Sequence, residues 1–379
     1  MHFLIKGLPS SGKTTLVKEI IPEIKNKRGF YTEEIRDIKG KRIGFKLIIL
    51  SNNKEIIFAH QDFKTPFKIS KYSIDVKVFE DAVIKELEEG IKSDCDFLII
   101  DEIGKIELIS EKFKETCLRA FHYKNAIATI PMQNIPYIKN IQENKDVCVV
   151  ELKRENFLEV KEYLKMGLKV WDIERIRQFE QKAYQLGLSE RILIENASTN
   201  MLNIIEKLNL GKSLLIVAGR GNNGADVLSC ARKMIAKGFI LDIVVLGEKP
   251  PNQECGFQIG VLQKLNVNIN FIKDVDELSL LNKLLEKKDF VLDGLLGIGI
   301  KGEVSSLIKR VMERINESKK IVVSCDIPSG LDPQTGKILG EAIKSTFTIT
   351  FIAPKKGFFL NDGPNLCGKI HLTDIGIPI

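Results

Sequence analysis

Short apolar runs alternate with stretches of helical spacing through the first 160 residues. The apolar run at 2–6 (HFLIK) precedes a stretch at 16–21 (LVKEII) with helical periodicity, and FLII at 97–100 reads as a buried strand. Short apolar runs predict strands, and apolar residues three or four positions apart predict helices. Between them lies a polar stretch rich in β-forming residues. This order predicts an α/β domain built on a parallel sheet.

The second half repeats the alternation more regularly. A long amphipathic region, 172–209, is interrupted by a turn at Gly187–Arg191 and predicts helices that pack on a sheet. Six β-branched runs follow, separated by helical stretches, at 214–219, 242–247, 267–272, 290–295, 320–326 and 347–353. Strands that alternate regularly with helices predict a Rossmann-like, doubly wound α/β/α domain.

Length and charge pattern predict two domains. At 379 residues the chain exceeds the usual size of one domain. A charged helical stretch at 152–172 has no Pro-rich or Gly-rich linker, and we place the boundary near Met166. The expected domains are 1–165 and 166–379.

Composition narrows the ligand classes. Hydrophobic residues make up 44% and charged residues 28%, the balance of a globular protein. The net charge of +7 and the pI near 8.8 suit phosphate-bearing small molecules, but the pI lies below the value of about 9 that marks nucleic-acid domains. No apolar run approaches the roughly 18 residues of a membrane span, and the first strand begins at the first residues. We therefore expect a cytoplasmic protein that binds neither nucleic acid nor membrane.

Cysteine and histidine usage limits the chemistry further. The seven cysteines are odd in number and form no C-x-x-C pair, which predicts reduced thiols. Only four histidines are present, so a zinc site or a histidine-based triad has few candidates. Catalysis must rest on carboxylates, lysines and backbone groups.

The segment GLPSSGKT at 7–14 is a P-loop, between an apolar strand and a helix. Glycines at both ends let backbone N–H groups surround phosphate oxygens, Lys13 reaches the β and γ phosphates, and the Thr14 hydroxyl holds Mg²⁺. The predicted phosphate-binding residues are Gly7, Leu8, Pro9, Ser10, Ser11, Gly12, Lys13 and Thr14. The motif predicts a nucleoside triphosphate bound with Mg²⁺.

Two acidic residues follow a buried strand in the same domain. FLIID at 97–101 ends in Asp101, the expected second magnesium carboxylate, and Glu102 comes next. We expect Glu102 to polarise the attacking water. The alternative is that Glu102 is an ordinary acid at a strand end, which caps a turn or forms an ion pair.

This half resembles the small P-loop nucleoside-triphosphatases first described from thermophiles. The resemblance covers about residues 1–164 and rests on the P-loop and on GFYTEEIR at 29–36, RIGFK at 42–46, DEIGKIEL at 101–108 and VVELKRENF at 149–157. It implies hydrolysis of nucleoside triphosphates to the diphosphate and phosphate with little base preference. Arg36 and Arg42 are candidates to stabilise the γ-phosphate, and a solvated surface role is as good an account of each.

A second glycine loop, GRGNNG at 219–224, follows the strand at 214–219. It satisfies G-x-G-x-x-G, but the next strand-end acid, Glu248, lies farther along than a dinucleotide fingerprint requires. Two asparagines and Asp226 add short polar side chains that dinucleotide loops rarely need. They suggest coordination or hydrogen bonding to a ligand.

Two further strand ends carry polar chemistry, DGLLGIGIKGE at 293–303 and CDIPSGLDP at 325–333. Ligands of doubly wound sheets bind at the carboxyl ends of strands, so three loops are expected to converge on one crevice. Asn223, Asp293 and Ser329 offer only oxygen and one carboxylate, which suits a hard monovalent cation.

The three loops resemble the YjeF amino-terminal domain family, the NAD(P)H-hydrate epimerases, across about residues 166–379. ILIENA at 192–197, FIAPKKG at 351–357 and DIGIP at 374–378 add to the match. The resemblance implies interconversion of the R and S forms of hydrated NADH or NADPH, with K⁺ held by Asn223, Asp293 and Ser329. The residues implied to contact the nucleotide are Asn222, Asn223, Gly224, Ala225, Asp226, Gly297, Ile298, Gly299, Ile300, Lys301, Gly302, Glu303 and Asp326.

Epimerisation of a carbon that bears a hydroxyl requires a proton donor and a proton acceptor beside it. We assign this role to Asp326, with Lys301 as a helper or as a solvated loop lysine. The sequence departs from many family members at Arg220, Ala225 and Val227. A methyl group at 225 is expected to narrow the approach to phosphate.

Two alternatives to catalysis in the second domain stay open. The domain is either a non-catalytic nucleotide-binding module that regulates the triphosphatase or, on GRGNNG alone, an NAD-dependent dehydrogenase, although no hydride-site His or Tyr–Lys pair is evident. No segment resembles the dehydratase often joined to the epimerase family, so a separate dehydratase is the expected partner. The resemblance also implies a homodimer.

Overall fold

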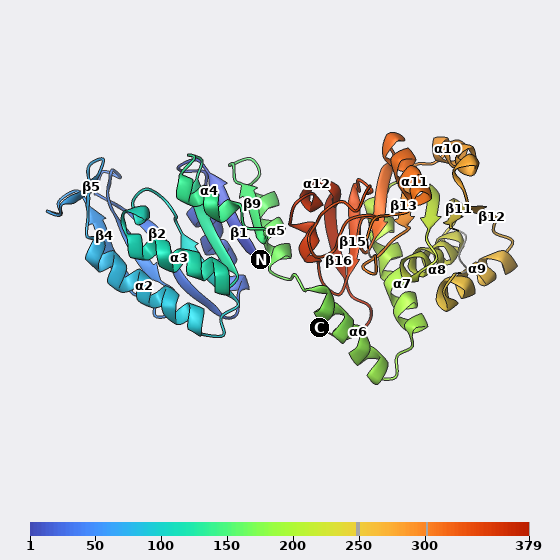
Figure 1. The fold of residues 1–379 in the computed structure, drawn as a ribbon, viewed down its shortest axis with the longest axis horizontal. Helices are drawn as coiled ribbons and strands as arrows, with labels where there is room; N and C mark the ends of the chain where they lie inside the picture. The colour runs from blue at the N-terminus through green and yellow to red at the C-terminus, as the bar shows by residue number, and fades with distance from the viewer. Residues whose placement is uncertain (248–250, 301, 379) are drawn as a thin grey trace. The chain divides into compact units, whose positions relative to one another are not determined.

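The computed structural model describes residues 1–247, 251–300 and 302–378, and the chain forms two compact units (Figure 1). Unit 1 is Met1–Leu168 and unit 2 is Lys169–Ile379. The position near Met166 that we expected for the boundary falls inside the last helix of unit 1, α5 (Phe157–Gly167). Lys301 and Glu248 lie outside the described residues.

Unit 1 is built on one mixed sheet in the order β5-β6-β4-β3-β2-β7-β8-β1-β9. Its strands are β1 (His2–Gly7), β2 (Lys27–Arg36), β3 (Arg42–Ile49), β4 (Glu55–His60), β5 (Phe67–Ile69), β6 (Tyr72–Ile74), β7 (Phe97–Asp101), β8 (Ala126–Pro131) and β9 (Val147–Glu151). The predicted parallel part consists of β2, β7, β8, β1 and β9. The polar stretch extends it with the antiparallel strands β3, β4, β5 and β6, so the sheet is mixed around the predicted parallel part.

Helices cover this sheet and carry local start signals. They are α1 (Lys13–Ile20), α2 (Val76–Lys92), α3 (Glu111–Tyr123), α4 (Pro136–Gln142) and α5, with 3₁₀ turns at Ile21–Glu23 and Glu107–Ile109. Asp75 caps α2 by accepting from the Val78 N–H at 3.0 Å, and Ser110 caps α3 by accepting from Phe113. Such caps satisfy N–H groups that the helix itself leaves without partners.

Unit 2 contains a parallel sheet in the order β12-β11-β10-β13-β14-β15-β16. Its strands are β10 (Ser213–Ala218), β11 (Ile240–Leu246), β12 (Ile269–Ile272), β13 (Phe290–Gly294), β14 (Ile321–Cys325), β15 (Phe347–Phe351) and β16 (Lys369–Thr373). The first six match the predicted runs, and β16 was not predicted. The strand order reverses between β10 and β13, and ligands of open α/β sheets bind at such a switch point.

Helices pack on both faces of this sheet, as a doubly wound fold requires. They are α6 (Ile173–Gln185), α7 (Glu190–Leu208), α8 (Asn222–Ala236), α9 (Gln253–Lys264), α10 (Leu278–Glu286), α11 (Ser306–Glu317) and α12 (Gly363–Leu366), with 3₁₀ turns at Val275–Glu277 and Lys356–Phe358. Along β10, Ile216 packs with the apolar faces of α7 and α8, while the next residue, Val217, packs with α10 and α11. Alternate residues of a strand point to opposite faces, so both faces are buried. The predicted α/β fold class is confirmed.

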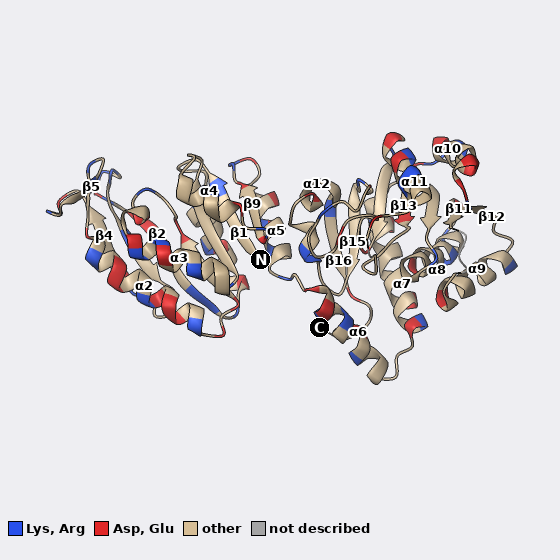
Figure 2. Ribbon diagram, in the orientation of Figure 1, with Lys and Arg blue, Asp and Glu red and all other residues tan. Residues whose placement is uncertain are grey.

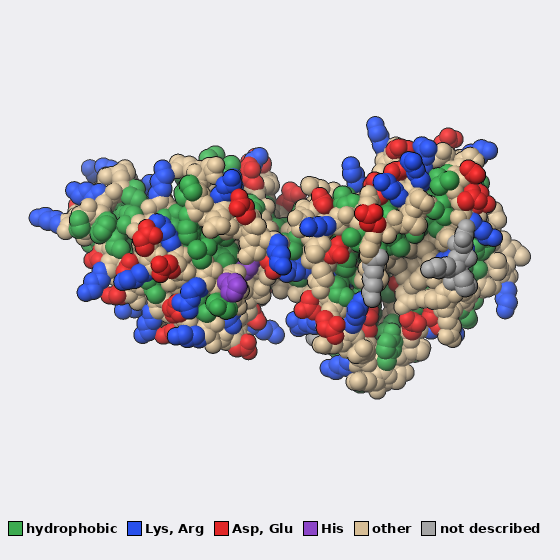
Figure 3. Space-filling model, viewed as in Figure 1, with side chains coloured by type: hydrophobic (Ala, Val, Ile, Leu, Met, Phe, Trp, Pro, Cys, Tyr) green, Lys and Arg blue, Asp and Glu red, His purple; other side chains and the backbone are tan. Residues whose placement is uncertain are grey.

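Charged side chains recur along the helices, whereas β8, β10, β14 and β15 carry none (Figure 2). On the face shown in Figure 3, Lys and Arg are interspersed with Asp and Glu. Within the described part of the chain, no helix is both long and apolar enough to cross a membrane. The seven cysteines are free thiols.

Candidate active sites

The P-loop of unit 1 folds around its own lysine. The Lys13 ammonium donates to the carbonyls of Gly7 at 3.0 Å and Leu8 at 3.2 Å. Gly12, with φ of 97°, adopts the left-handed region that glycine tolerates, immediately before α1. A Cβ at Gly7 would lie 2.5 Å from Ser11 Oγ and 2.9 Å from the Leu152 carbonyl. The loop therefore needs glycine at both ends.

A cavity of about 750 Å³ opens beside this loop. Its lining includes Gly7, Leu8, Pro9, Ser10, Gly12, Lys13, Thr14, Arg36, Arg42, Glu102 and Glu107. Ser11 lies beneath the lining, and its buried hydroxyl oxygen has no hydrogen-bond partner among the described residues. An unpaired buried hydroxyl is costly, so a ligand or ordered water at the loop would relieve it.

The predicted magnesium pair is in contact. Thr14 Oγ1 donates to Asp101 Oδ2 at 2.8 Å, and Thr129 Oγ1 donates to the other carboxylate oxygen at 2.6 Å. Asp101 is fully buried, and burial raises its pKa, against the hydrogen bonds that lower it. A hydroxyl and a carboxylate side by side are oxygen ligands of the kind that Mg²⁺ prefers. The residues present fit the predicted ion.

A second carboxyl, Glu107, accompanies the predicted Glu102. Burial raises the pKa of Glu102, and burial together with the Glu102 charge raises the pKa of Glu107 to about 8. Glu107 accepts from the Gly104 N–H at 3.1 Å. Sequence reasoning missed Glu107, although it stands within the DEIGKIEL segment.

The two candidate arginines line the cavity, and each forms an ion pair with a glutamate. Both Arg36 and Arg42 form ion pairs with Glu34, and Arg42 also donates to the Tyr72 hydroxyl at 2.9 Å. Their side chains are 58% and 41% exposed. Both arginines line the cavity and stay partly exposed to solvent.

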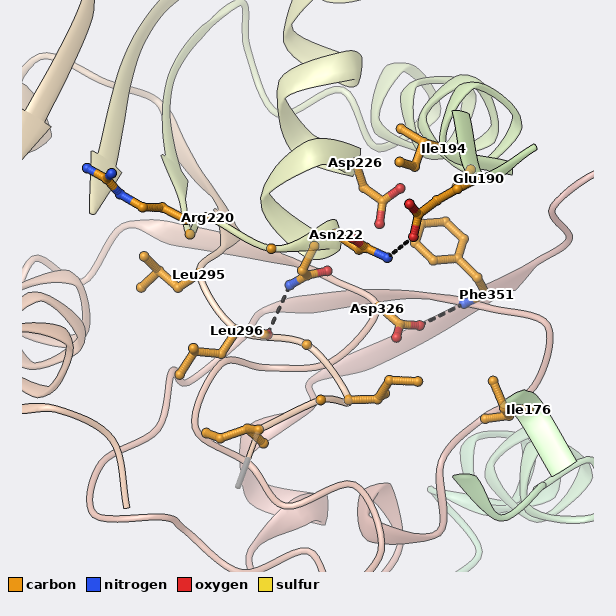
Figure 4. Close-up of a pocket in the computed structure, with 18 of the residues that line it drawn as sticks. Ile176, Glu190, Ile194, Arg220, Asn222, Asp226, Leu295, Leu296, Asp326 and Phe351 are labelled. Atoms are coloured by element: carbon orange, nitrogen blue, oxygen red, sulfur yellow. Dashed lines mark hydrogen bonds between the residues drawn. The ribbon is translucent and has the colours of Figure 1, made fainter. Parts of the chain in front are cut away.

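Unit 2 holds a larger cavity, of about 1020 Å³, at the carboxyl ends of its central strands (Figure 4). The predicted residues that line it are Asn222, Asn223, Asp226, Gly297, Ile298, Gly299, Ile300 and Asp326. The predicted loops after β10, β13 and β14 therefore converge. Gly224, Ala225, Gly302 and Glu303 are not among the lining residues, and Lys301 lies outside the described residues.

The three glycines of GRGNNG differ in role. A Cβ at Gly219 would lie 1.9 Å from the Leu295 carbonyl, and one at Gly224 would lie 2.1 Å from the Gly219 carbonyl. A Cβ at Gly221 would meet no described atom within 4 Å. The outer glycines therefore serve close backbone packing at the start of α8, and Gly221 leaves open space beside the cavity.

The predicted potassium ligands are linked by hydrogen bonds: Asp293 and Ser329 are fully buried and bond directly, and Asn223, which lines the cavity, joins them through the Leu296 backbone. Asp293 Oδ1 accepts from Ser329 Oγ at 2.6 Å, and its Oδ2 accepts from the Ser329 N–H at 3.0 Å and from Ser324 Oγ at 2.7 Å. Asn223 donates to the Leu296 carbonyl at 2.9 Å. One carboxylate among neutral oxygens suits a monovalent hard cation, so the donor set fits K⁺.

Asp326 follows β14 in the left-handed region, with φ of 64°. Its Oδ1 accepts from the Phe351 N–H at 3.2 Å and from Thr350 Oγ1 at 3.3 Å, and it forms an ion pair with Lys355. The Lys355 side chain is only 1% exposed, and its ammonium also donates to Thr350 Oγ1 at 2.7 Å. Sequence reasoning missed Lys355, which stands in the FIAPKKG segment.

Two more carboxyls, Asp226 and Glu180, line the cavity with Asp326. Figure 4 shows Asp226 and Asp326 directed toward the same space from α8 and from the loop after β14. Burial, with the charges of Asp326 and Glu180, raises the pKa of Asp226 well above its usual range. Burial and the Asp326 charge raise the pKa of Glu180 to about 7. Glu180 was missed, because nothing in an amphipathic helix marks one glutamate as special.

Of the three positions at which the sequence departs from the family pattern, two lie in the hydrophobic core and not on the cavity wall. Ala225 and Val227 are fully buried in the hydrophobic core, so the expected narrowing by the 225 methyl group was wrong. Arg220 does line the cavity, and its Nε donates to the Leu246 carbonyl at 3.0 Å. The cavity wall is therefore altered at one of the three positions.

A P-loop in one unit and a glycine loop at the switch point of the other place this chain among nucleotide-binding α/β proteins. Two family models match it in separate parts: the model described as NTPase over residues 2–165, and the model described as YjeF-related protein N-terminus over residues 190–357.

Curated relatives of both kinds are similar to the chain. Nucleoside-triphosphatase THEP1 of Thermotoga sp. (strain RQ2) is 41% identical over 157 residues, which cover 41% of this chain and 88% of that protein. NAD(P)H-hydrate epimerase of Weissella koreensis is 31% identical over 209 residues, 53% of this chain and 89% of that protein. The bifunctional NAD(P)H-hydrate repair enzyme Nnr of Moorella thermoacetica is 31% identical over 192 residues, which cover 49% of this chain and 36% of that enzyme. The chain belongs to both the NTPase family and the YjeF-related amino-terminal family.

Proposed function

We propose that this chain is a bifunctional enzyme. Unit 1 hydrolyses nucleoside triphosphates to the diphosphate and phosphate, and unit 2 interconverts the R and S forms of hydrated NADH and NADPH. The observation that carries this proposal is that each unit has its own cavity, lined by the motif residues of its own family. A separate dehydratase that removes water from one form would complete the repair.

In unit 1, Thr14 and Asp101 are placed to hold Mg²⁺, which neutralises phosphate charge when bound. The Lys13 ammonium and the N–H groups at the start of α1 bind the phosphates. Glu102 orients and deprotonates the attacking water, while Arg36 or Arg42 meets the charge on the γ-phosphate.

Phosphate release tests this half of the proposal. We expect Mg²⁺-dependent release from all four common nucleoside triphosphates by the intact chain, and loss of release in Thr14→Ala. Mg²⁺-independent release, or release unchanged in Thr14→Ala, would contradict the assignment.

In unit 2, Asn223, Asp293 and Ser329 are placed to hold K⁺, which would order the loops beneath the substrate. Gly221 leaves room for the nucleotide to approach the backbone. Asp326 faces the reacting ring carbon, and Lys355 holds its carboxylate in place. A homodimer is the assembly that we propose.

Two measurements separate catalysis from the alternatives in unit 2. A regulatory binding module would bind the two forms with equal affinity, without interconverting them, and would change the rate of phosphate release. A dehydrogenase would change the absorbance of NADH or NAD⁺ at 340 nm with a suitable substrate. Interconversion without a change in cofactor oxidation state supports the epimerase.

A further inference from the structure

Glu180 lies on α6, where it lines the same cavity as Asp326 although the two stand far apart in the chain. We propose that Glu180 is a catalytic residue of unit 2, which gives a proton to the substrate hydroxyl and shares proton transfer with Asp326. This inference rests on the proposed epimerase function and names the acid that the function requires.

The reaction needs two groups because its two halves move protons in opposite directions. When the hydroxyl leaves, a carboxyl group protonates it, the carbon–oxygen bond breaks, and the lone pair of the ring nitrogen forms a carbon–nitrogen double bond. Water is released, and water then adds to the opposite face of the ring, where a carboxylate takes its proton. Atoms and charge balance, with one proton passed from the first carboxyl to the second.

Asp326 suits the role of proton acceptor, and a second group is needed as the proton donor. Its Oδ1 already receives the Phe351 N–H and the Lys355 ammonium. Both groups donate to Oδ1, so this carboxylate stands at the cavity as a hydrogen-bond acceptor. The donor must therefore be another group on the cavity wall.

Glu180 is the best placed of the other carboxyls. Glu190, another carboxyl on the cavity wall, accepts a hydrogen bond from Asn222 at 2.5 Å. By contrast, no described residue forms a hydrogen bond or an ion pair with the carboxyl group of Glu180. Burial and the neighbouring carboxylates raise the pKa of Asp226 well above its usual range. Glu180, with a pKa of about 7, is the carboxyl that both gives and regains a proton at neutral pH.

The charged groups around Glu180 come from several elements. Asp326 after β14 and Glu190 on α7 raise its pKa, while Lys355 after β15 and Arg177 on α6 lower it. Burial and Asp326 dominate these effects. The rate of epimerisation should therefore fall as the pH rises through about 7, because Glu180 loses its proton.

The test is Glu180→Gln, which keeps the size of the side chain and removes the proton. Glu174→Gln is the matched control, because Glu174 is exposed on the first turn of the same helix and is not among the residues that line the cavity. With pure R-form hydrated NADH and K⁺, we expect Glu180→Gln to lower kcat by about 100-fold or more, within the range for general acid catalysis. KM should change by less than about threefold, since a neutral amide still fits the wall.

A structural role would not change the shape of the pH profile. Wild type and Glu174→Gln should show an inflection near pH 7, and the residual rate of Glu180→Gln should not. Retention of activity within about threefold in Glu180→Gln, or a flat wild-type profile from about pH 6 to 8, would overturn the role of Glu180 while leaving the epimerase in place. Absence of interconversion by wild type would overturn the proposed function itself and this inference with it.

Discussion

Replacing Lys355 with methionine removes the ammonium from a buried ion pair and keeps most of the stem. Lys355 is 1% exposed and pairs with Asp326, whose side chain is 15% exposed. Removing one partner of a buried pair typically costs about 3–5 kcal/mol, because the other charge stays behind. Asp326 keeps its Phe351 N–H bond and some contact with solvent, so we expect a loss of about 3 kcal/mol, at the low end of that range.

Fluorescence of Trp171 provides the assay. It is the only tryptophan of the chain, it lies in unit 2, and it forms a β-bridge with Lys355. Urea titration followed through Trp171 therefore reports the free energy of unfolding of unit 2 alone. A loss of about 3 kcal/mol should lower the thermal midpoint of a unit of this size by about 6–12 °C.

Two further variants serve as controls for this prediction. Lys337→Met, at an exposed position, should change the free energy of unfolding by no more than about 0.5 kcal/mol. Adding Asp326→Asn to Lys355→Met removes the stranded charge and should restore about 1–2 kcal/mol. A loss below about 1 kcal/mol in Lys355→Met, or no recovery in the double variant, would refute the reasoning.

Three other predictions follow from the same contacts. Lys13→Ala should lower NTP hydrolysis by about 100-fold or more, measured as phosphate release, and leave epimerisation within about twofold; a matched loss of both would show coupling. Gly219→Ala should destabilise unit 2 strongly in the Trp171 titration, because its Cβ would lie 1.9 Å from a carbonyl, while Gly221→Ala should fold normally and weaken nucleotide binding. Asp293→Asn should cost about 2 kcal/mol through lost charge-assisted hydrogen bonds and abolish the response of epimerisation to K⁺, and retention of that response would place K⁺ elsewhere.

Much of the fold could be predicted, because local signals determine much of it. Buried parallel strands read as continuous apolar runs, so six strands of unit 2 and the P-loop strand were visible. The antiparallel strands of unit 1 and the edge strand β16 were harder, because half-exposed strands mix polar and apolar residues. The hydrophobic pattern of one segment also does not show which strand that segment pairs with.

The same limit explains the candidate sites. Loops after parallel strands must meet at one edge of the sheet, so the convergence of the segments containing Asn222, Asp293 and Asp326 was predictable. Glu180 was not, because only packing brings α6 to that edge. The buried position of Lys355 likewise depends on the register of β15 and the loop after it.

The most direct test of the central claim is chiral chromatography of pure R-form hydrated NADH incubated with the intact chain and K⁺, beside Asp326→Ala and Lys13→Ala. The account predicts that the S form appears faster than the spontaneous rate with wild type and Lys13→Ala, and not with Asp326→Ala. If wild type gives no exchange above the spontaneous rate, unit 2 is not an epimerase, and the account of its cavity is contradicted.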